Sequence, residues 1–342
     1  MLAPGQVVGG RYRVTDRPVG AAVCAVDLRS GEQVRLAGLE LPELLDDEDW
    51  EAADPWAGLA GRVSAGLAGV PVHPRLLRGF EAFVEGRWLW SAEELPAGVP
   101  LAELTERPWS PYRVAELAAD LAGALGALHR AGLVHGNVSA ASVLVGEDGA
   151  ALLGGQVSGA AEEAFCAELG GPVPRRVYEA RAVLLGVRAE RWAPMGGPAG
   201  DGWALGVLMY RLLTGYPPYP ERELGELLAA VRDGRYAPAE GCGPLRPVVE
   251  GLLSGRLALG QLRLWLAAFL AAAPEPFERV GPLLPVVRPR GPVVPRQRAK
   301  VPAERPGRSG RRISPLLLGP VLVGGVLVLL VAALAAVVAF GG

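Results

Sequence analysis

The segment LVHGNVSAAS, residues 133–142, carries the closest grouping of side chains that could do chemistry. His135 could exchange a proton near neutral pH, because its ordinary pKa lies near 6.5. Asn137 carries an amide, which cannot accept a proton as a general base. Ser142 supplies a hydroxyl, and no carboxylate lies in the segment. Catalysis or metal binding here would therefore rest on His135 alone.

Cysteine and lysine, the other residues that commonly act as nucleophiles, are scarce. The three cysteines, Cys24, Cys166 and Cys242, have no C-x-x-C spacing, so neither a disulfide framework nor a zinc site is indicated. The only lysine is Lys300. This bias, with its excess of alanine, glycine, leucine and arginine, is typical of a high-GC bacterial genome. It also leaves residues 1–299 without an amino side chain.

The elements that position these residues change in character near residue 100. Before it, short β-like runs such as RYRVTD, AAVCAVDL, EQVRLAGL, RLLRGFEAF and RWLWSAE alternate with turn signals, which predicts an antiparallel sheet. After it, Ser110 and Pro111 form a helix N-terminus, and Gly132 ends the helix. One face of that helix is apolar, consisting of Val114, Leu117, Ala118, Leu121, Leu125 and Leu128. We therefore expect a β-rich lobe at 9–95 and a helical lobe at 96–280.

Four stretches together resemble bacterial Ser/Thr protein kinases over residues 10–270. LGALHRAGLVHGNVSAASVLVGEDGAALLGG is similar to their catalytic-loop region, and RAERW to the Pro-Glu end of their activation segment. DGWALGVLMYRLLTGYPPY is similar to the kinase F helix, and GRYRVTDRPVGAAVCAVDLRSGEQVRL to the opening strands. The resemblance implies an α+β, two-lobed kinase-like fold for residues 1–280.

The resemblance also implies which positions would hold ATP, and these are altered. The phosphate-binding lysine of kinases falls at Ala37 in EQVRLAGL, with Arg35 two residues earlier. The stretch that resembles the C helix, PWAGLAGRVSAGLAGV, has no glutamate to pair with it. The glycine-rich loop retains only Gly20. Arg35 is not interchangeable with the phosphate-binding lysine, because the rigid, forked guanidinium differs from the point charge of an ammonium.

The catalytic and magnesium positions are altered as well. Asn137 stands where kinases have the catalytic aspartate, and Ser142 where they have a magnesium-binding asparagine. In ALLGGQ the magnesium aspartate falls at Leu153, Gly154 or Gly155, depending on the register. Asp148, the only aspartate between His135 and Glu190, lies in the turn sequence GEDG and is interpreted as a turn residue.

Three residues at positions that hold the helical lobe of kinases together are retained. By the resemblance, His135 is a packed histidine, Glu190 forms a salt bridge within the lobe, and Asp201 anchors the backbone of the catalytic loop. The arginine that would pair with Glu190 is not evident from the sequence. By this resemblance, the sequence keeps residues that stabilise the helical lobe of a kinase and lacks those that bind phosphate, bind magnesium or act as the general base.

The C-terminal part of the chain differs in charge and hydropathy. From residue 281 onward there are nine basic residues and one acidic residue, a net charge of +8, and the whole chain carries −2, so residues 1–280 carry −10. Residues 281–312 are rich in proline and arginine and are interpreted as a disordered linker. Residues 313–342 contain no charged residue, and the run 316–340 would span roughly 37 Å as a helix, enough to cross a bilayer.

We therefore predict a single-pass protein of the cell membrane whose kinase-like body is cytoplasmic, because the basic flank stays inside. The predicted function is that of an inactive kinase-like protein, a pseudokinase, which acts as a signalling scaffold or regulator with a protein partner. No cofactor is expected, and the acidic body argues against nucleic-acid binding. The linker could also contact anionic lipid. Two alternatives are a divergent Ser/Thr kinase that uses arginine and displaced acids with Mg-ATP, and an unrelated activity on a similar fold.

Overall fold

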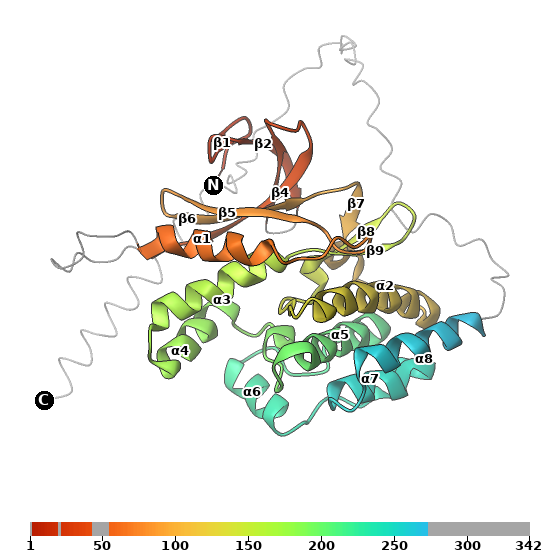
Figure 1. Ribbon diagram of the computed structural model, residues 1–342. Coiled ribbons are helices and arrows are strands. Elements are labelled where there is room, and N and C mark those ends of the chain that lie inside the picture. Colours follow the sequence, from red (N-terminus) through yellow and green to blue (C-terminus); the bar gives the residue numbers. More distant parts are fainter. Residues whose placement is uncertain (1, 20–21, 43–54, 273–342) are drawn as a thin grey trace, which may run out of the picture. The chain divides into compact units, whose positions relative to one another are not determined.

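The computed structural model describes residues 2–19, 22–42 and 55–272 (Figure 1). Gly20 and the predicted linker and membrane span lie outside these residues. Within the described residues, no helix is both long enough and apolar enough to cross a membrane.

The N-terminal part is an antiparallel six-stranded sheet with the strand order β1-β2-β3-β4-β6-β5. Its strands are Val7–Val8 (β1), Tyr12–Val19 (β2), Ala22–Asp27 (β3), Gln33–Glu40 (β4), Gly79–Glu85 (β5) and Trp88–Glu94 (β6). All five predicted runs contribute a strand. The side chains of β4 alternate: Val34 and Leu36 pack into the core on one face, while Arg35 and Ala37 point to the opposite face. Helix α1, Pro55–Leu67, packs beside β5.

The C-terminal part is helical, and its centre is the pair of helices α2, Pro111–Arg130, and α5, Gly197–Thr214. The hydroxyl of Ser110 caps α2 by accepting a hydrogen bond from the Arg113 N–H, and the six residues of the predicted apolar face are all buried. Around this pair lie α6 (Leu224–Arg232), α7 (Arg246–Leu253) and α8 (Leu259–Ala271). A small sheet of β7 (Gly98–Pro100), β8 (Val143–Gly146) and β9 (Ala151–Leu153) lies at the junction with the N-terminal part. This arrangement, a β-sheet part followed by a helical part, is consistent with a kinase fold.

The stretch between β9 and the predicted end of the activation segment forms two helices, for which the sequence analysis made no prediction. These are α3, Gln156–Gly170, and α4, Pro174–Leu185, which pack against each other and bring α3 against α1 and the sheet (Figure 1). Apolar residues of α3 recur at helical spacing, with Val157, Ala161 and Phe165 buried beside Trp56 of α1. The core under α1 is therefore shared between the N-terminal sheet and α3.

Candidate functional site

The predicted site positions meet in the cleft between the six-stranded sheet and the helical part. On the sheet side, Arg35 and Ala37 of β4 lie opposite Glu93 and Ser91 of β6 in register. On the other side are the loop after α2, which carries Asn137, and the turn that follows β9. The structure thus brings most of the predicted positions together.

A buried glutamate that the sequence analysis did not single out occupies this cleft. One oxygen of the Glu93 carboxylate pairs with the Arg35 guanidinium at 2.5 Å, and the other accepts a hydrogen bond from the Gly155 N–H at 2.7 Å. The side chain of Glu93 is 4% exposed and that of Arg35 17% exposed. The cavity lined by these residues and by Ser142 has a volume of about 190 Å³. The Glu93 carboxylate therefore joins β4 to β6 through Arg35 and the sheet to the turn after β9 through Gly155.

Gly154 follows β9 at one of the three positions considered for the magnesium aspartate. A Cβ atom at Gly154 would lie 2.9 Å from Cδ1 of Leu77 and 3.2 Å from Oε1 of Glu93. An aspartate here would thus meet both a steric contact and a second buried negative charge. The presence of Glu93 explains why glycine is accommodated at this position better than a carboxylate.

We expect Arg35 and Glu93 to be energetically coupled. Glu93→Ala should lower the free energy of unfolding by about 2–3 kcal/mol, because it leaves the buried Gly155 N–H and the Arg35 guanidinium without their acceptor. Combining it with Arg35→Ala should show a coupling of about 1–3 kcal/mol in a double-mutant cycle of urea unfolding. The exposed pair of Arg175 and Glu179, with side chains 86% and 56% exposed, is the control and should couple by less than about 0.5 kcal/mol. Additive effects of the Arg35 and Glu93 substitutions would contradict the bridge.

Asn137, at the position of the catalytic aspartate, is held on both sides of its amide. Its Nδ2 donates to the Gly155 carbonyl at 2.9 Å, and its Oδ1 accepts from the Arg191 guanidinium at 3.1 Å. Helix α3 passes close by, since a Cβ atom at Gly159 would lie 2.7 Å from the Cβ of Asn137. The Asn137 side chain is thus engaged in internal contacts and packs, half-buried, against α3.

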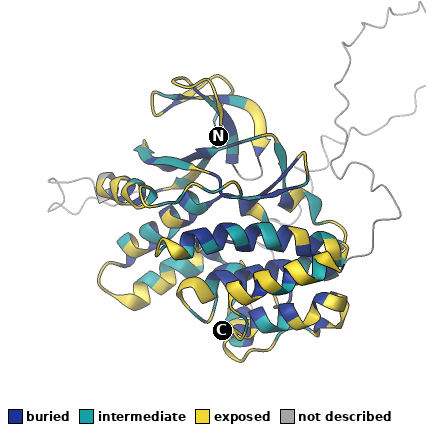
Figure 2. Ribbon diagram, turned by 45° about the vertical axis from the view of Figure 1, so that its right-hand side comes forward, coloured by how far each residue is buried: buried dark blue, intermediate teal, exposed yellow. Residues whose placement is uncertain are grey.

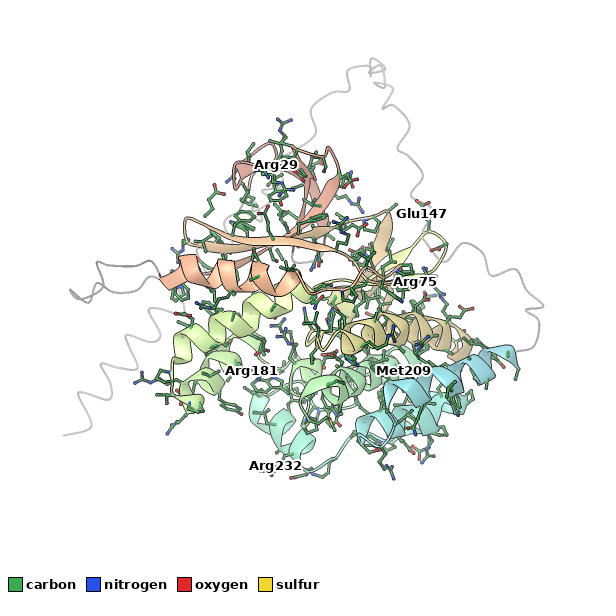
Figure 3. All side chains as sticks on the ribbon, in the orientation of Figure 1. Arg29, Arg75, Glu147, Arg181, Met209 and Arg232 are labelled. Carbon is green, nitrogen blue, oxygen red and sulfur yellow. The ribbon has the colours of Figure 1, made fainter. Side chains whose placement is uncertain are left out.

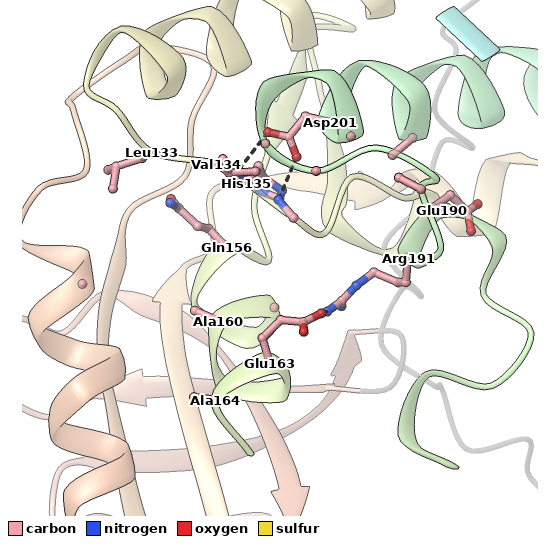
Figure 4. Close-up of a pocket in the computed structure, with 18 of the residues that line it drawn as sticks. Leu133, Val134, His135, Gln156, Ala160, Glu163, Ala164, Glu190, Arg191 and Asp201 are labelled. Atoms are coloured by element: carbon pink, nitrogen blue, oxygen red, sulfur yellow. Dashed lines mark hydrogen bonds and ion pairs between the residues drawn. The ribbon is translucent and has the colours of Figure 1, made fainter. Parts of the chain in front are cut away.

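Arg191 is the centre of the polar network that fixes α3 to the loop. Its side chain is 1% exposed, and it forms ion pairs with Glu162 and, at 2.8 Å, with Glu163 of α3 (Figure 4). Arg181 of α4 pairs with the same Glu163 at 3.3 Å and donates to the Arg191 carbonyl at 3.1 Å (Figure 3 labels Arg181). The hairpin of α3 and α4 is therefore joined to the catalytic-loop region by several buried or half-buried charges.

Ser142, at the position of the magnesium-binding asparagine, takes part in a local turn. Its hydroxyl donates to the Ser139 carbonyl and accepts from the Ser139 N–H, both at 2.9 Å. Asp148 likewise accepts from the Ala150 N–H at 2.9 Å within the β8–β9 turn. Among the described residues, no group of three or more histidine, cysteine, aspartate or glutamate side chains could hold a metal ion.

Asp201 of α5 holds the backbone of the loop at its other end. Its carboxylate accepts hydrogen bonds from the N–H groups of His135 at 2.9 Å and Gly136 at 2.8 Å, and it contacts Nε2 of His129 at 2.8 Å (Figure 4). His135 is buried, and its Nε2 lies 3.1 Å from the Gly154 carbonyl. Burial lowers the pKa of His135 below its ordinary value. The histidine that could have carried the chemistry of the segment thus links two backbone segments in the interior.

Glu190 lies at the edge of ion-pairing distance from Arg211. The two groups are 3.8 Å apart, whereas Arg211 pairs more closely with Glu221. The Glu190 side chain is 9% exposed, and burial raises the pKa of its carboxyl, an effect that Arg211 only partly offsets. Arg211 is thus the arginine nearest to Glu190, but it is shared with a second carboxylate.

The raised pKa of Glu190 predicts that its ionised carboxylate lowers the stability of the fold at neutral pH. Because the folded state holds this proton more tightly than the unfolded state, Glu190 contributes stability below its unfolded pKa near 4.3 and loses it as the pH rises through the folded pKa. Glu190→Gln should therefore unfold at a higher urea concentration than the wild type at pH 7, and the difference should shrink as the pH is lowered. Urea unfolding at a series of pH values measures this difference. A variant that is less stable at pH 7 would show that the pair with Arg211 dominates.

A second cavity lies beside this network, between α1, the loop after α2, α3 and α5. It has a volume of about 660 Å³ and is lined mainly by apolar atoms, together with the polar side chains Gln156, Glu163, Glu190, Arg191 and Asp201 (Figure 4). Asp201 and Arg191 have their charged groups bonded within the protein. Part of the polar lining of this cavity therefore belongs to the network that holds α3 and the loop.

Comparison with known proteins gives distant matches to protein kinases. The chain is 25% identical over 221 residues to serine/threonine-protein kinase PAK 4 of Homo sapiens, which covers 63% of this chain and 36% of that protein. It is 33% identical over 139 residues to serine/threonine-protein kinase PknL of Mycobacterium tuberculosis, which covers 40% of this chain and 33% of that protein. The chain thus spans about a third of the length of these relatives, and no family model matches it. Sequence similarity and fold together show a kinase-like domain that is distantly related to Ser/Thr protein kinases.

Proposed function

We propose that this protein is a membrane-anchored, catalytically inactive kinase-like protein that acts by binding other proteins. The observation that carries the proposal is the state of Asn137. At the position where a kinase needs a carboxylate facing its substrate, this chain has an amide that bonds to Gly155 and Arg191 and packs against α3. Such a side chain neither accepts a proton nor reaches a substrate hydroxyl.

The other positions that serve phosphoryl transfer support the same proposal. Ala37 cannot bind phosphate, Ser142 is used in a local turn, and Gly154 has no side chain that could hold magnesium. Phosphoryl transfer depends on positioning and charge stabilisation by these groups. Because such groups act as a unit, the loss of several together removes nearly all of the acceleration that they provide.

The cleft also argues against a resident nucleotide. Its cavity of about 190 Å³ is smaller than the ~300–1,000 Å³ of ordinary small-molecule sites. The Glu93 carboxylate lies in it with its partner Arg35, and it would repel an entering phosphate group. A nucleotide would have to break this bridge before it could bind.

A divergent active kinase is the second candidate, and one observation favours it. Glu93 places a carboxylate beside Gly154, close to where a kinase has its magnesium aspartate, and Arg35 places a positive charge beside it. If Mg-ATP displaced Arg35 from Glu93, a displaced acid would face the metal. The nucleotide-binding test below separates this candidate from the inactive one.

The cellular setting of the proposal comes from the sequence. The uncharged run 313–342 would anchor the chain, and the nine basic residues beyond position 280 would keep the kinase-like domain at the cytoplasmic face. A domain without turnover acts through the surfaces that it presents, so we propose a protein partner in signalling. The basic segment would add contacts with anionic lipid.

Thermal unfolding of the full chain in mild detergent, with and without Mg-ATP, tests the proposal. A nucleotide present at about 100 times its dissociation constant would stabilise the folded state by roughly 2.7 kcal/mol. We expect the same melting temperature with Mg-ATP as with magnesium alone. An increase in melting temperature that requires both magnesium and ATP would contradict a cleft without nucleotide and favour the second candidate.

A further inference from the structure

Helix α8 exposes an apolar side that no described element covers. Its sequence, LGQLRLWLAAFLA, is apolar around most of its circumference, and Leu259, Leu262 and Leu266 pack into the core. Leu264 points outward and is 76% exposed. The other exposed positions are Gly260, Gln261, Arg263, Ala267, Ala268 and Ala271 (Figure 2). A helix of a globular domain normally turns a polar side to water, so this side indicates a further contact.

Three aromatic rings lie along the contact between α8 and α2, where Trp265 and Phe269 also pack against the core. Phe269 of α8 stacks on Tyr112 of α2 with ring centroids 4.9 Å apart, and on Trp265 with centroids 5.3 Å apart. Tyr112 is 38% exposed, while Trp265 and Phe269 are half-buried. Aromatic rings with one apolar and one wet side are typical of contacts at a membrane–water interface.

The charge of α8 and its neighbour α2 is favourable for an anionic surface. Residues 251–272 contain two arginines, Arg256 and Arg263, and no acidic residue. At the other end of the helix pair, a guanidinium nitrogen of Arg263 and one of Arg130 lie within 4 Å of where a Cβ atom would stand at Gly126. The acids of α2 are Glu116 and Asp120, which pair with Arg113 at 2.9 Å and with Arg75 at 3.0 Å (Figure 3 labels Arg75). The pair α2 and α8 thus combines an apolar strip with exposed arginines.

We propose that the exposed side of α8, with Tyr112 of α2, lies on the surface of an anionic lipid bilayer. Leu264 and Tyr112 would enter the region between headgroups and acyl chains, while Arg263 and Arg130 would meet lipid phosphates. The inference rests on the membrane anchor of the proposed function. It adds that the domain is oriented by a second, specific contact rather than held only by its linker.

Three observations favour a lipid surface over a second copy of this chain. The residues that follow α8 lead, after forty positions, 273–312, to the uncharged run, so the strip is the part of the domain nearest in sequence to the anchor. Residues 281–312, which lead directly into the uncharged run, contain nine basic residues and one acidic residue. A strip with one large aliphatic side chain is small beside the ~1,200–2,000 Å² of a stable protein interface. A tethered domain needs only weak intrinsic affinity, because the anchor raises its local concentration at the bilayer.

A fluorescent label on Leu264→Cys in the full chain tests this contact. The native cysteines Cys24, Cys166 and Cys242 are buried, so the label goes to the new cysteine. The chain is reconstituted into vesicles that contain phosphatidylserine and nitroxide-bearing lipids. We expect the label at position 264 to lose most of its emission, and to recover it when phosphatidylcholine replaces phosphatidylserine or when Arg263→Glu is added. A label on Val183→Cys, 89% exposed on α4 and away from α8 in Figure 1, is the control and should stay bright.

The outcomes that overturn the proposal are distinct from a failure of the anchor. If the chain floats with the vesicles but labels at 264 and 183 are quenched equally, the α8 contact is wrong and the anchor stands. If labels at 264 quench each other between chains without any effect of nitroxide lipid, the side of α8 binds a second copy instead. If the chain does not float with vesicles, the anchor fails, and the inference built on it fails too.

Discussion

Replacing Asp201 by alanine is expected to lower the free energy of unfolding by about 4 kcal/mol. The carboxylate accepts from the N–H groups of His135 and Gly136 and contacts His129, and its side chain is 1% exposed. Alanine would leave the buried His135 N–H and the partly buried Gly136 N–H without their acceptor. Asp201→Asn keeps one acceptor oxygen and should lose less.

Urea unfolding of the full chain in mild detergent, followed by tryptophan fluorescence, measures this loss. Asp233→Ala is the matched control, because Asp233 is exposed and pairs only with the exposed Arg232 and Arg235. Its unfolding midpoint should equal that of the wild type. If Asp201→Ala unfolded at the wild-type midpoint as well, the loop would not depend on Asp201 for its conformation.

Replacing Arg191 by leucine is expected to cost about 3 kcal/mol. The substitution removes one guanidinium that serves Glu162, Glu163 and Asn137 at once, and it leaves the half-buried Glu162 and the Asn137 amide with fewer partners. The free energy of unfolding of Arg191→Lys should lie between those of the wild type and Arg191→Leu. Lysine keeps the positive charge, but its ammonium cannot reproduce the guanidinium fork that reaches three groups. Limited proteolysis should also show α3 and α4 cleaved earlier in Arg191→Leu than in the wild type.

Arg175→Leu on α4 is the control for this experiment, since its side chain is 86% exposed. It should change neither the unfolding midpoint nor the proteolysis pattern. If Arg191→Leu behaved like Arg175→Leu, the network would not be what holds α3 over the loop. The position of Asn137 against α3 would then need another cause.

Much of the fold could be predicted because its elements have local signals. The β-like runs between residues 11 and 93 each give a strand, and the helix that begins after Ser110 has the predicted buried face. Alternation and helical periodicity reflect burial of one face of a strand or helix, which the sequence records directly. Helix α3 also has such a signal, with Val157, Ala161 and Phe165 at helical spacing, although the sequence analysis made no use of it.

The contents of the cleft were harder to predict. The loss of the kinase lysine can be read from residue types, and the structure places Ser142 in one cavity with Arg35 and Glu93. Glu93 was missed because it lies in the run RWLWSAEE, which shows only a strand. Its function depends on Arg35 and Gly155, which are 58 and 62 residues away. Contacts of that kind follow from the register of β4 and β6 and from the path of the chain after β9, and neither is a local property.

The network around Arg191 illustrates the same point. In the sequence, RAERW draws attention to Glu190, which resembles a structural glutamate of kinases. In the structure, Glu190 lies 3.8 Å from Arg211, while its neighbour Arg191 pairs with α3 and Asn137. No spacing rule would have joined residues 137, 162 and 191, because the helix that joins them folds back over the loop.

Transfer of phosphate tests the central claim most directly. The full chain in mild detergent is incubated with magnesium and γ-labelled ATP, alone and with a generic protein substrate, beside the variant Asn137→Ala. The account predicts no incorporation above a blank without protein in either, because the amide of Asn137 is not a general base. Magnesium-dependent incorporation above the blank would contradict it, whether or not Asn137→Ala retains that incorporation.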